Sequence, residues 1–476
     1  MDRDVPVLIQ GGMGVAVSDW RLARAVARLG HLGVVSGVAL DVVMVRRLQL
    51  GDPDGDIRRA LEALPLPGAA ERILDRYFIA GGKQADERFK LSSMKRDNPS
   101  RNVEELIIAA NFVEVYLAKE GHTGPVGINY LEKVQAPTLP SLYGAMLAGV
   151  DYVLMGAGIP KTIPAVLDQL AQGNPVELRL DVKGAKEGDD FRSRFDPAGS
   201  FEGPPPTLDR PAFLAIVSSH VLAVMLATKI EVPPDGFIVE APTAGGHNAP
   251  PRGKLRLDEG GEPIYGDRDV PDLGVIADLG LPFWLAGGHA SPEGIRQALD
   301  RGAAGVQVGT AFAYCEESGF DPGFKKQVVN LSRRGEVKVS TDPLASPSGF
   351  PFKVVQLDRT LSDPDVYAER EREPCKLGYL RSAYRNDEGG IGWRCPAEPV
   401  EVYIGKGGSI EETVGRKCLC GSLLANVGLG QLLVDGTPER ALITSGDDVV
   451  HVAQFLAPEA ESYTAADVVR YLLPDG

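Results

Sequence analysis

One histidine in this chain stands where it could do acid–base chemistry. His247 lies in the run Thr243-Ala244-Gly245-Gly246-His247, shortly after an apolar segment that ends at Glu240. An imidazole has an ordinary pKa near 6.5, so at neutral pH it can take a proton from carbon or give one up. The flanking glycines would let the ring lie close to the backbone. We predict that His247 is catalytic; the alternative is a structural histidine bonded to a loop carbonyl.

Glycines also follow two later apolar segments. The runs are Trp284-Leu285-Ala286-Gly287-Gly288 and Val306-Gln307-Val308-Gly309-Thr310, and Ser291-Pro292 is typical of a helix start just after the first. Glycine lets backbone N–H groups approach an anion, and a helix N-terminus favours negative charge. The pattern predicts a phosphate-binding site in which His289 supports the backbone. The alternative is that the glycines only form tight turns.

These residues need a scaffold that brings them together. Short apolar runs recur along the chain, usually followed by helical periodicity, which indicates parallel βαβ units whose strands are covered on both faces. Eight runs would close a TIM-type (β/α)8 barrel, whose active site lies at the carboxyl ends of the strands. A doubly wound open sheet is the alternative α/β fold. The runs begin near Val5, Leu32, Val126, Tyr152, Phe213, Gly236, Pro282 and Ala304.

The barrel is expected to occupy residues 1–335, with a first helix over 19–29 and Ser18 as its N-cap. Residues 336–476 lack the βα pattern. We call them the C-terminal extension and expect them to pack on the barrel.

Two insertions are expected within the barrel, and either could cover its mouth. The first, at about 40–122, contains helical patterns over 42–64 and 103–118. The second, at about 176–208, begins with a predicted strand over 176–182 and continues into a charged, proline-rich loop.

The composition excludes some classes of protein. The formal net charge of −15 argues against a nucleic-acid surface, since no basic patch stands out. No run of about 18 apolar residues occurs, so no membrane span is expected. The first residues do not resemble a signal peptide, so a cytoplasmic location is expected. Nothing in the pattern favours a dimer over a monomer.

The cysteines do not suggest a disulfide scaffold. Cys315 follows the eighth strand and is expected in the core, whereas Cys375, Cys395, Cys418 and Cys420 all lie in the C-terminal extension. Four thiolates could hold zinc or an iron–sulfur cluster, but paired Cys-x-x-Cys spacings are missing. We therefore predict buried free thiols and no metal.

Several of these motifs occur in an order that resembles the nitronate monooxygenase (2-nitropropane dioxygenase) family and its relatives, the FMN-dependent enoyl-acyl-carrier-protein reductases. The similarity spans roughly residues 5 to 320. It rests on Gln10-Gly11-Gly12-Met13, Gly127-Ile128-Asn129, Gly156-Ala157-Gly158-Ile159-Pro160, Ala244-Gly245-Gly246-His247, Ala286-Gly287-Gly288 and Gln307-Val308-Gly309-Thr310.

The resemblance implies an oxidoreductase that binds FMN. His247 would be the active-site base that takes a proton from the α-carbon of a nitroalkane. Electrons would pass from the nitronate to FMN and then to oxygen. The implied cofactor contacts are Gly11, Gly12, Met13, Asn129, Glu240, Gly245 and Gly246 near the flavin ring, and Gly287, Gly288, Gln307, Gly309 and Thr310 at its phosphate.

The chain also departs from the family pattern. Gly11-Gly12 stands where many monooxygenases have Ala-Pro, and this form is nearer the enoyl reductases. Glu240 replaces a glutamine, and Thr243 replaces a glutamate before the glycine pair. The natural substrate therefore stays open.

Three functions are compatible with these observations. The first is a nitronate monooxygenase acting on a small molecule. The second is an NAD(P)H-using enoyl reductase acting on a thioester, with an acyl carrier protein as possible partner and a basic rim supplied by Lys83, Lys90, Lys95 and Arg96. The third is a non-catalytic flavin-binding protein, which a histidine at the barrel mouth disfavours.

Overall fold

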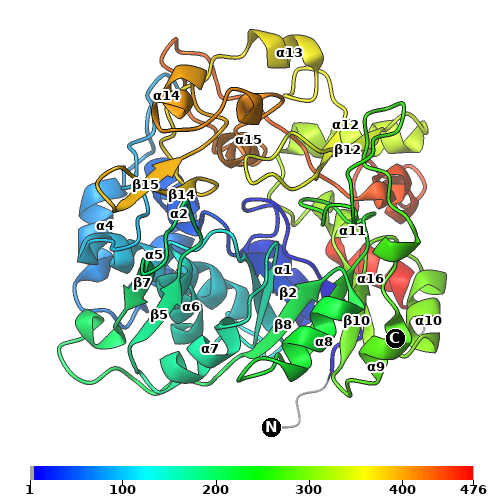
Figure 1. The fold of residues 1–476 in the computed structure, drawn as a ribbon. Coiled ribbons are helices and arrows are strands. Elements are labelled where there is room, and N and C mark those ends of the chain that lie inside the picture. The colour runs from blue at the N-terminus through cyan, green and yellow to red at the C-terminus, as the bar shows by residue number, and fades with distance from the viewer. Residues whose placement is uncertain (1–4, 475–476) are drawn as a thin grey trace.

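A closed barrel of eight parallel strands forms the centre of the computed structural model, which describes residues 5–474 (Figure 1). All eight predicted strands are present. The first strand pairs with the last, with Leu8 opposite Val306, so the sheet is closed and the predicted TIM-type barrel is confirmed. In order around the barrel the strands are β1 (Leu8–Gln10), β11 (Gly305–Val308), β10 (Phe283–Ala286), β9 (Gly236–Glu240), β8 (Ala212–Val217), β4 (Tyr152–Gly156), β3 (Val126–Leu131) and β2 (Leu32–Ser36).

The barrel strands are apolar throughout because both of their faces are covered. Inside the barrel, Trp284 packs with Leu154, Ile238 and neighbouring residues, and its indole N–H donates to the Pro6 carbonyl at 2.6 Å. The outer faces pack against helices. These are α1 (Trp20–Arg28), α6 (Thr138–Leu147), α7 (Ile163–Ala171), α8 (His220–Thr228), α9 (Leu273–Ala277), α10 (Pro292–Asp300), α11 (Thr310–Ala313) and α12 (Pro322–Arg333).

Two predicted helix starts have different outcomes. Ser291 caps α10 as expected, accepting a hydrogen bond from the Gly294 N–H at 3.0 Å. Ser18 does not cap α1: the cap is Asp19, whose carboxylate accepts from the N–H of Arg21. A carboxylate at the first turn also suits the helix dipole.

The first insertion is helical, and the predicted helical pattern over 42–64 corresponds to two helices. It divides at the turn Gly51-Asp52, where both residues have positive φ, and the Asp52 carboxylate accepts from the N–H of Ile57 in the next helix. The predicted helix over 103–118 is present as part of α5. The elements are α2 (Leu40–Gln49), α3 (Asp56–Glu62), α4 (Ala69–Tyr77) and α5 (Arg101–Lys119).

The second insertion pairs with the C-terminal extension. The predicted strand over 176–182 is split into β5 (Val176–Arg179) and β6 (Val182–Lys183). β5 pairs with β7 (Arg192–Phe195), whereas β6 lies parallel to β14 (Ser382–Arg385), because the chain changes partner between them. A short 3-10 helix, η1 (Pro197–Ser200), follows β7.

The C-terminal extension lies across the carboxyl ends of the barrel strands, at the top of Figure 1. Its last helix returns to the side of the barrel and contacts α1 and α10. No helix within residues 5–474 has the length and apolar character needed to cross a membrane. Its elements are β12 (Val339–Asp342), β13 (Phe352–Val355), α13 (Pro364–Glu369), β14, β15 (Ile391–Arg394), α14 (Val400–Gly405), η3 (Glu411–Thr413), α15 (Leu419–Ala425), η4 (Asp447–Phe455) and α16 (Ala465–Leu472).

Candidate active site

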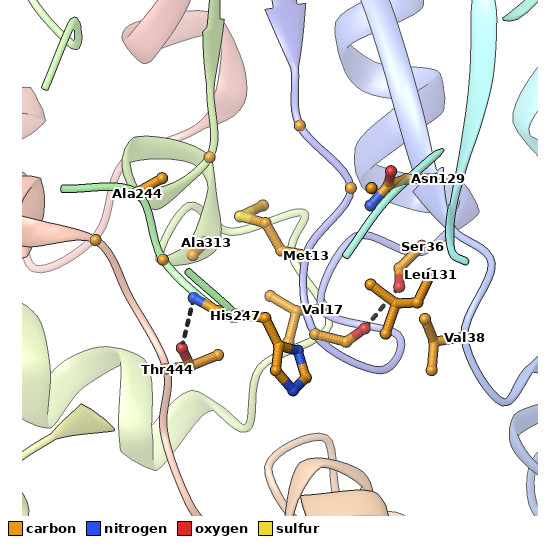
Figure 2. A pocket seen from close by; sticks show the side chains of 18 of the residues that line it. Met13, Val17, Ser36, Val38, Asn129, Leu131, Ala244, His247, Ala313 and Thr444 are labelled. Atoms are coloured by element: carbon orange, nitrogen blue, oxygen red, sulfur yellow. Dashed lines mark hydrogen bonds between the residues drawn. The ribbon is translucent and has the colours of Figure 1, made fainter. Parts of the chain in front are cut away.

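A cavity opens between the carboxyl ends of the barrel strands and the C-terminal extension. Its empty volume, mouth included, is about 1580 Å³. Figure 2 shows the His247 side chain in the space that Met13 and Asn129 also border. Of the predicted site residues only Gly288 does not line it. Those that do are Gly11, Gly12, Met13, Asn129, Glu240, Gly245, Gly246, His247, Gly287, Gln307, Gly309 and Thr310.

The turn after β1 is held rigidly by buried polar side chains. Gln10 accepts from the Val34 N–H at 3.0 Å and donates to the Ser18 hydroxyl at 3.0 Å. That hydroxyl accepts from the Met13 N–H at 3.1 Å. Ser18 therefore anchors this turn, which explains why the neighbouring residue caps α1.

Glycine is required in this turn because side chains crowd it. A Cβ on Gly12 would lie 2.6 Å from the Asn129 Cβ and 3.3 Å from Val34 Cγ1. A Cβ on Gly11 would lie 3.2 Å from Gln307 Cγ. The glycines thus leave room for a flat ligand to approach the backbone.

Three buried polar atoms lining the cavity have no hydrogen-bond partner among residues 5–474. They are the side-chain oxygens of Asn129, Thr243 and Gln307. An unpaired buried polar atom typically costs about 1–3 kcal/mol, so such atoms are rare unless a ligand or water satisfies them. A ligand with hydrogen-bonding edges would satisfy these oxygens.

Glu240 ends β9 and faces the cavity. Burial raises the pKa of its carboxyl from 4.5 to about 8. At neutral pH the carboxyl is therefore mostly protonated, and it can donate a hydrogen bond as a glutamine would. This accounts physically for a glutamate at a position where the resembled family has glutamine.

His247 is held between the barrel and the extension. Its Nε2 lies 2.7 Å from the Ser346 hydroxyl, which is 2.8 Å from the Ser348 hydroxyl. The imidazole packs edge-on against the Phe352 ring, with 4.9 Å between centroids. Burial, with a smaller contribution from the positive charge of Lys133, lowers the pKa of His247 to about 3. The imidazole is therefore neutral at physiological pH.

The backbone around His247 is clamped by the extension. The Gly246 N–H donates to the Thr444 hydroxyl at 2.9 Å, as Figure 2 shows, and the Gly246 carbonyl accepts from the Lys353 N–H at 2.9 Å. The N–H of Asn248 donates to the Pro351 carbonyl at 2.9 Å. The histidine is thus fixed by a hairpin more than 100 residues away in sequence.

The predicted phosphate loops contact a segment that the sequence analysis did not include. The Thr310 hydroxyl accepts from the Gly446 N–H at 2.9 Å. The Gly288 N–H donates to the Asp448 carboxylate, whose pKa is raised by burial. Asp448 therefore places a titratable acid where the sequence predicts an anion, and its charge depends on pH.

Sequence reasoning missed the wall that the extension contributes. The polar run Thr444-Ser445-Gly446-Asp447-Asp448 follows the buried Leu442-Ile443, so a strand-end pattern was present there. No comparable signal marks Ser346, which lies in a proline-rich loop. The extension residues that line the cavity are Phe352, Leu377, Tyr379, Leu380, Cys420, Leu423, Leu424, Thr444, Ser445, Gly446 and Asp448.

One predicted surface residue is buried instead. Lys95 was expected in a basic rim, but its side chain is 2% exposed and forms an ion pair with Asp41. The Tyr379 hydroxyl donates to the same carboxylate. Desolvation makes an unpaired ammonium costly, so Lys95 pairs inside the protein and the rim prediction is wrong for this residue.

Comparisons with known proteins agree with the resemblance. Residues 210–342 match the family model described as nitronate monooxygenase, and this segment contains His247 and both glycine loops. Over 96 residues the chain is 35% identical to a nitronate monooxygenase of Pseudomonas aeruginosa, covering 19% of this chain and 24% of that one. Over 180 residues it is 31% identical to the nitronate monooxygenase npaC of Metarhizium robertsii, covering 36% and 46%. The aligned regions therefore span less than half of these relatives.

Solved structures resemble the whole chain more distantly. FabK from Thermotoga maritima is 15% identical with a TM-score of 0.47, covering 99% of this chain and 92% of its own. A nitroalkane oxidase from Streptomyces ansochromogenes is also 15% identical, with a TM-score of 0.46 and coverages of 99% and 96%.

Proposed function

We propose that this chain, which resembles the nitronate monooxygenase family, is an FMN-dependent oxidoreductase that oxidises nitroalkanes or alkyl nitronates with O2. The observation that carries the proposal is the position of a neutral, buried imidazole beside a glycine-lined cavity with unpaired amide oxygens. That arrangement joins a proton acceptor to a site for a flat polar cofactor.

The residues present fit FMN at its ring end. Gly11, Gly12 and Met13 would lie against the ring, and Asn129 and Gln307 have unpaired oxygens that would accept from its N–H edge. The oxygen and nitrogen of a side-chain amide can be exchanged by a flip, so Asn129 and Gln307 could also donate hydrogen bonds to the ring.

At the phosphate end the glycine loops at 287–288 and 309–310 would supply N–H groups. Asp448 lies there as well, so phosphate binding requires this acid to be protonated or to move aside. Bound FMN would supply the electron acceptor for the substrate and the centre that reacts with O2.

His247 would remove the proton from the α-carbon of the substrate. Its Nε2 is engaged by the Ser346 hydroxyl, so Nδ1 is the nitrogen that we assign to this proton transfer. Without substrate, burial disfavours the protonated form of His247. The negative charge that develops on the nitro group of the substrate would stabilise that form. The surrounding apolar rings exclude water from this step.

The choice of electron donor tests the reaction. The purified protein should be loaded with FMN and mixed anaerobically with ethyl nitronate, NADH or NADPH, while flavin absorbance is recorded. We expect rapid reduction by the nitronate alone. Reduction by a pyridine nucleotide and not by the nitronate would overturn the proposed reaction.

Replacement of the histidine tests the base. His247→Asn should lower kcat with a neutral nitroalkane by about 10²–10⁴-fold, because proton transfer to a positioned base is lost. FMN affinity should change little. With a preformed nitronate the loss should be much smaller, since the proton is already removed. Equal activity of the variant on both substrates would show that His247 is not the base.

A second candidate is an enoyl reductase that uses NAD(P)H. It is favoured by Gly11-Gly12, which replaces the Ala-Pro of many monooxygenases. Rapid reduction of the flavin by NADPH, followed by reoxidation with an enoyl thioester, would support it. Its carrier-protein rim cannot include Lys95, which is buried in an ion pair.

A further inference from the structure

A second cavity lies inside the C-terminal extension, and four cysteines line it. Cys375, Cys395, Cys418 and Cys420 come from three separate segments of chain, yet all four border this one space. None of them forms a disulfide. The cavity has an empty volume of about 1040 Å³, its mouth included. Convergence of four thiols from distant segments requires an explanation, because each segment alone would suggest only a buried thiol.

Two of the four sulfurs accept hydrogen bonds from backbone N–H groups. The Ala397 N–H donates to Cys395, and the Leu380 N–H donates to Cys420. Cys420 lies in the first turn of α15, and the Cys395-Pro396 pair ends β15. Hydrogen bonds from backbone N–H groups to cysteine sulfur recur around iron–sulfur clusters, where they tune the potential.

Charges of both signs lie near the sulfurs. Glu398 interacts with Cys395, and Glu439 interacts with Cys418 and Cys420. The guanidinium of Arg381 is close enough to Cys375 and Cys395 for their charges to interact. Arg372 and Lys376 line the same cavity. Four thiolates carry a large negative charge, which neighbouring cations and a bound metal centre would offset.

We propose that Cys375, Cys395, Cys418 and Cys420 bind a [4Fe–4S] cluster. Each thiol loses one proton as its sulfur bonds to one iron of a preassembled cluster, so binding needs neither an oxidant nor a reductant. The Cys-x19-Cys-x22-Cys-x-Cys spacing differs from the paired knuckles of zinc ribbons. It is compatible with a cluster, whose ligands can come from separate loops.

The four thiols lie near one another, because Cys375 is close enough to Cys395, Cys418 and Cys420 for their charges to interact. A tetrahedral zinc site with Zn–S bonds near 2.3 Å brings its sulfurs to within about 4 Å of one another. Within the described part of the chain, no three Cys, His, Asp or Glu side chains are grouped tightly enough to hold one metal ion. A cubane core separates its ligands more widely and would fill the space that a lone ion leaves empty.

The position of this cavity links it to the candidate active site. Leu377, Leu380 and Cys420 line both cavities, so one layer of side chains separates them. A cluster ligated by Cys420 would therefore lie next to the site proposed for the flavin. It would also tie together the loop at 375, the end of β15 and α15, which form the wall opposite the barrel strands.

Chemical analysis of the anaerobically purified full-length chain tests the proposal without reference to activity. Iron, acid-labile sulfide, zinc and flavin should each be measured per chain, before and after reconstitution with equal amounts of ferrous and ferric iron together with sulfide. We expect about four iron and about four sulfide per chain. After dithionite reduction, a low-temperature EPR signal should appear that a flavin alone cannot give.

Variants locate the ligands. Cys375→Ser and Cys418→Ser should each lose most of the iron and sulfide, whereas Cys315→Ser should retain them. Cys315 is a matched control because it is a buried thiol in the barrel, bonded to the Phe312 carbonyl and distant from this cavity. If a variant fails to fold, the iron and sulfide content of the wild-type chain still tests the proposal.

Several results would overturn the proposal. One is a reconstituted wild-type chain without iron and sulfide, and another is one zinc per chain without sulfide. Retention of the full iron content by both Cys375→Ser and Cys418→Ser would also contradict it. Flavin content is measured separately, so failure here does not depend on whether the chain binds FMN.

Discussion

The two walls of the barrel cavity are built in different ways. The barrel wall includes glycine-rich turns after parallel strands, where backbone borders the cavity. The extension wall consists of bulky side chains such as Phe352, Leu377 and Tyr379, together with hydroxyls such as Thr444. The barrel wall therefore suits a ligand that lies flat against backbone. The extension wall suits positioning of His247 and exclusion of water.

This difference indicates a division of labour that substitutions can test. Changes in the barrel wall should act mainly on cofactor affinity, because they alter the surface against which the ring lies. Changes in the extension wall should act mainly on turnover or on the charge near the phosphate. The predictions below separate these effects.

The largest effect is expected from Gly12→Val. The new side chain would collide with Asn129, whose Cβ lies 2.6 Å from the position of a Cβ on residue 12. Overpacking of about 1–3 kcal/mol converts to a loss of FMN affinity of about 100-fold. Fluorescence titration with FMN would measure it. Gly203→Val is the control, since no atom lies within 4 Å of its added Cβ; equal losses in both variants would contradict the role of Gly12.

A smaller effect is expected from Ser346→Ala. The His247 imidazole would lose its partner on Nε2 and with it part of its fixed orientation. We expect kcat to fall about 5-fold with KM nearly unchanged, consistent with one lost hydrogen bond of about 1 kcal/mol. Ser340→Ala, on the same hairpin, removes a hydroxyl that bonds only to Gln356 and should be neutral. An unchanged kcat for Ser346→Ala would mean that the serine does not orient the base.

Asp448→Asn should raise FMN affinity by about fivefold at pH 8. Burial raises the pKa of Asp448, so its ionised form gains population as pH rises and repels the phosphate. Wild-type affinity should therefore fall with rising pH, and the variant should lack this component. Titrations over a pH series that extends upward from the ordinary pKa of 3.8 would measure it. Asp447→Asn removes a charge one residue away; the same gain in that control would point to net charge rather than to the contact with Gly288.

The smallest effect at neutral pH is expected from Glu240→Gln. Because burial raises the folded-state pKa of Glu240 to about 8, the protonated carboxyl already resembles an amide at pH 7. Its contribution to stability is complete below its ordinary pKa of 4.5 and is lost as pH rises through about 8. The melting temperature of the wild type should therefore fall relative to the variant between pH 7 and 9. Parallel curves for both proteins over this range would contradict the raised pKa.

The barrel was predictable because its strands are covered on both faces. That requirement produces continuous apolar runs such as Tyr152–Gly156, and it makes the strand ends easy to find. Glycine then marks the turns where backbone meets ligand. The strand ends could therefore be located from the pattern, whereas Gly11, Gly12, Met13, Asn129 and Glu240 were implied only by the family resemblance.

The sequence-based predictions were wrong at residues whose side chains can bond to several alternative partners. Ser18 looks like a helix cap, but its hydroxyl is used by the turn after β1, and Asp19 caps the helix instead. Lys95 looks like a surface charge, but its partner Asp41 is more than 50 residues away. Local sequence patterns do not reveal bonding partners that are distant in the sequence.

The extension was the least predictable region. Its strand β14 pairs with β6, and this contact joins residues 201 apart. Cys375, Cys395, Cys418 and Cys420 border one cavity although they come from three separate segments. Cysteine spacing alone therefore pointed to separate buried thiols.

The parallel pairing of β6 with β14 also constrains the order in which parts of the chain can fold during translation. The ring of strands can close once residue 308 has left the ribosome, since β11 completes it. About 75 further residues must then be synthesised before β14, the partner of β6, emerges. At translation rates of about 5–20 residues per second this delay lasts several seconds. Early in that interval, before residue 355 has emerged, the nascent chain has a closed ring but lacks the hairpin that clamps His247.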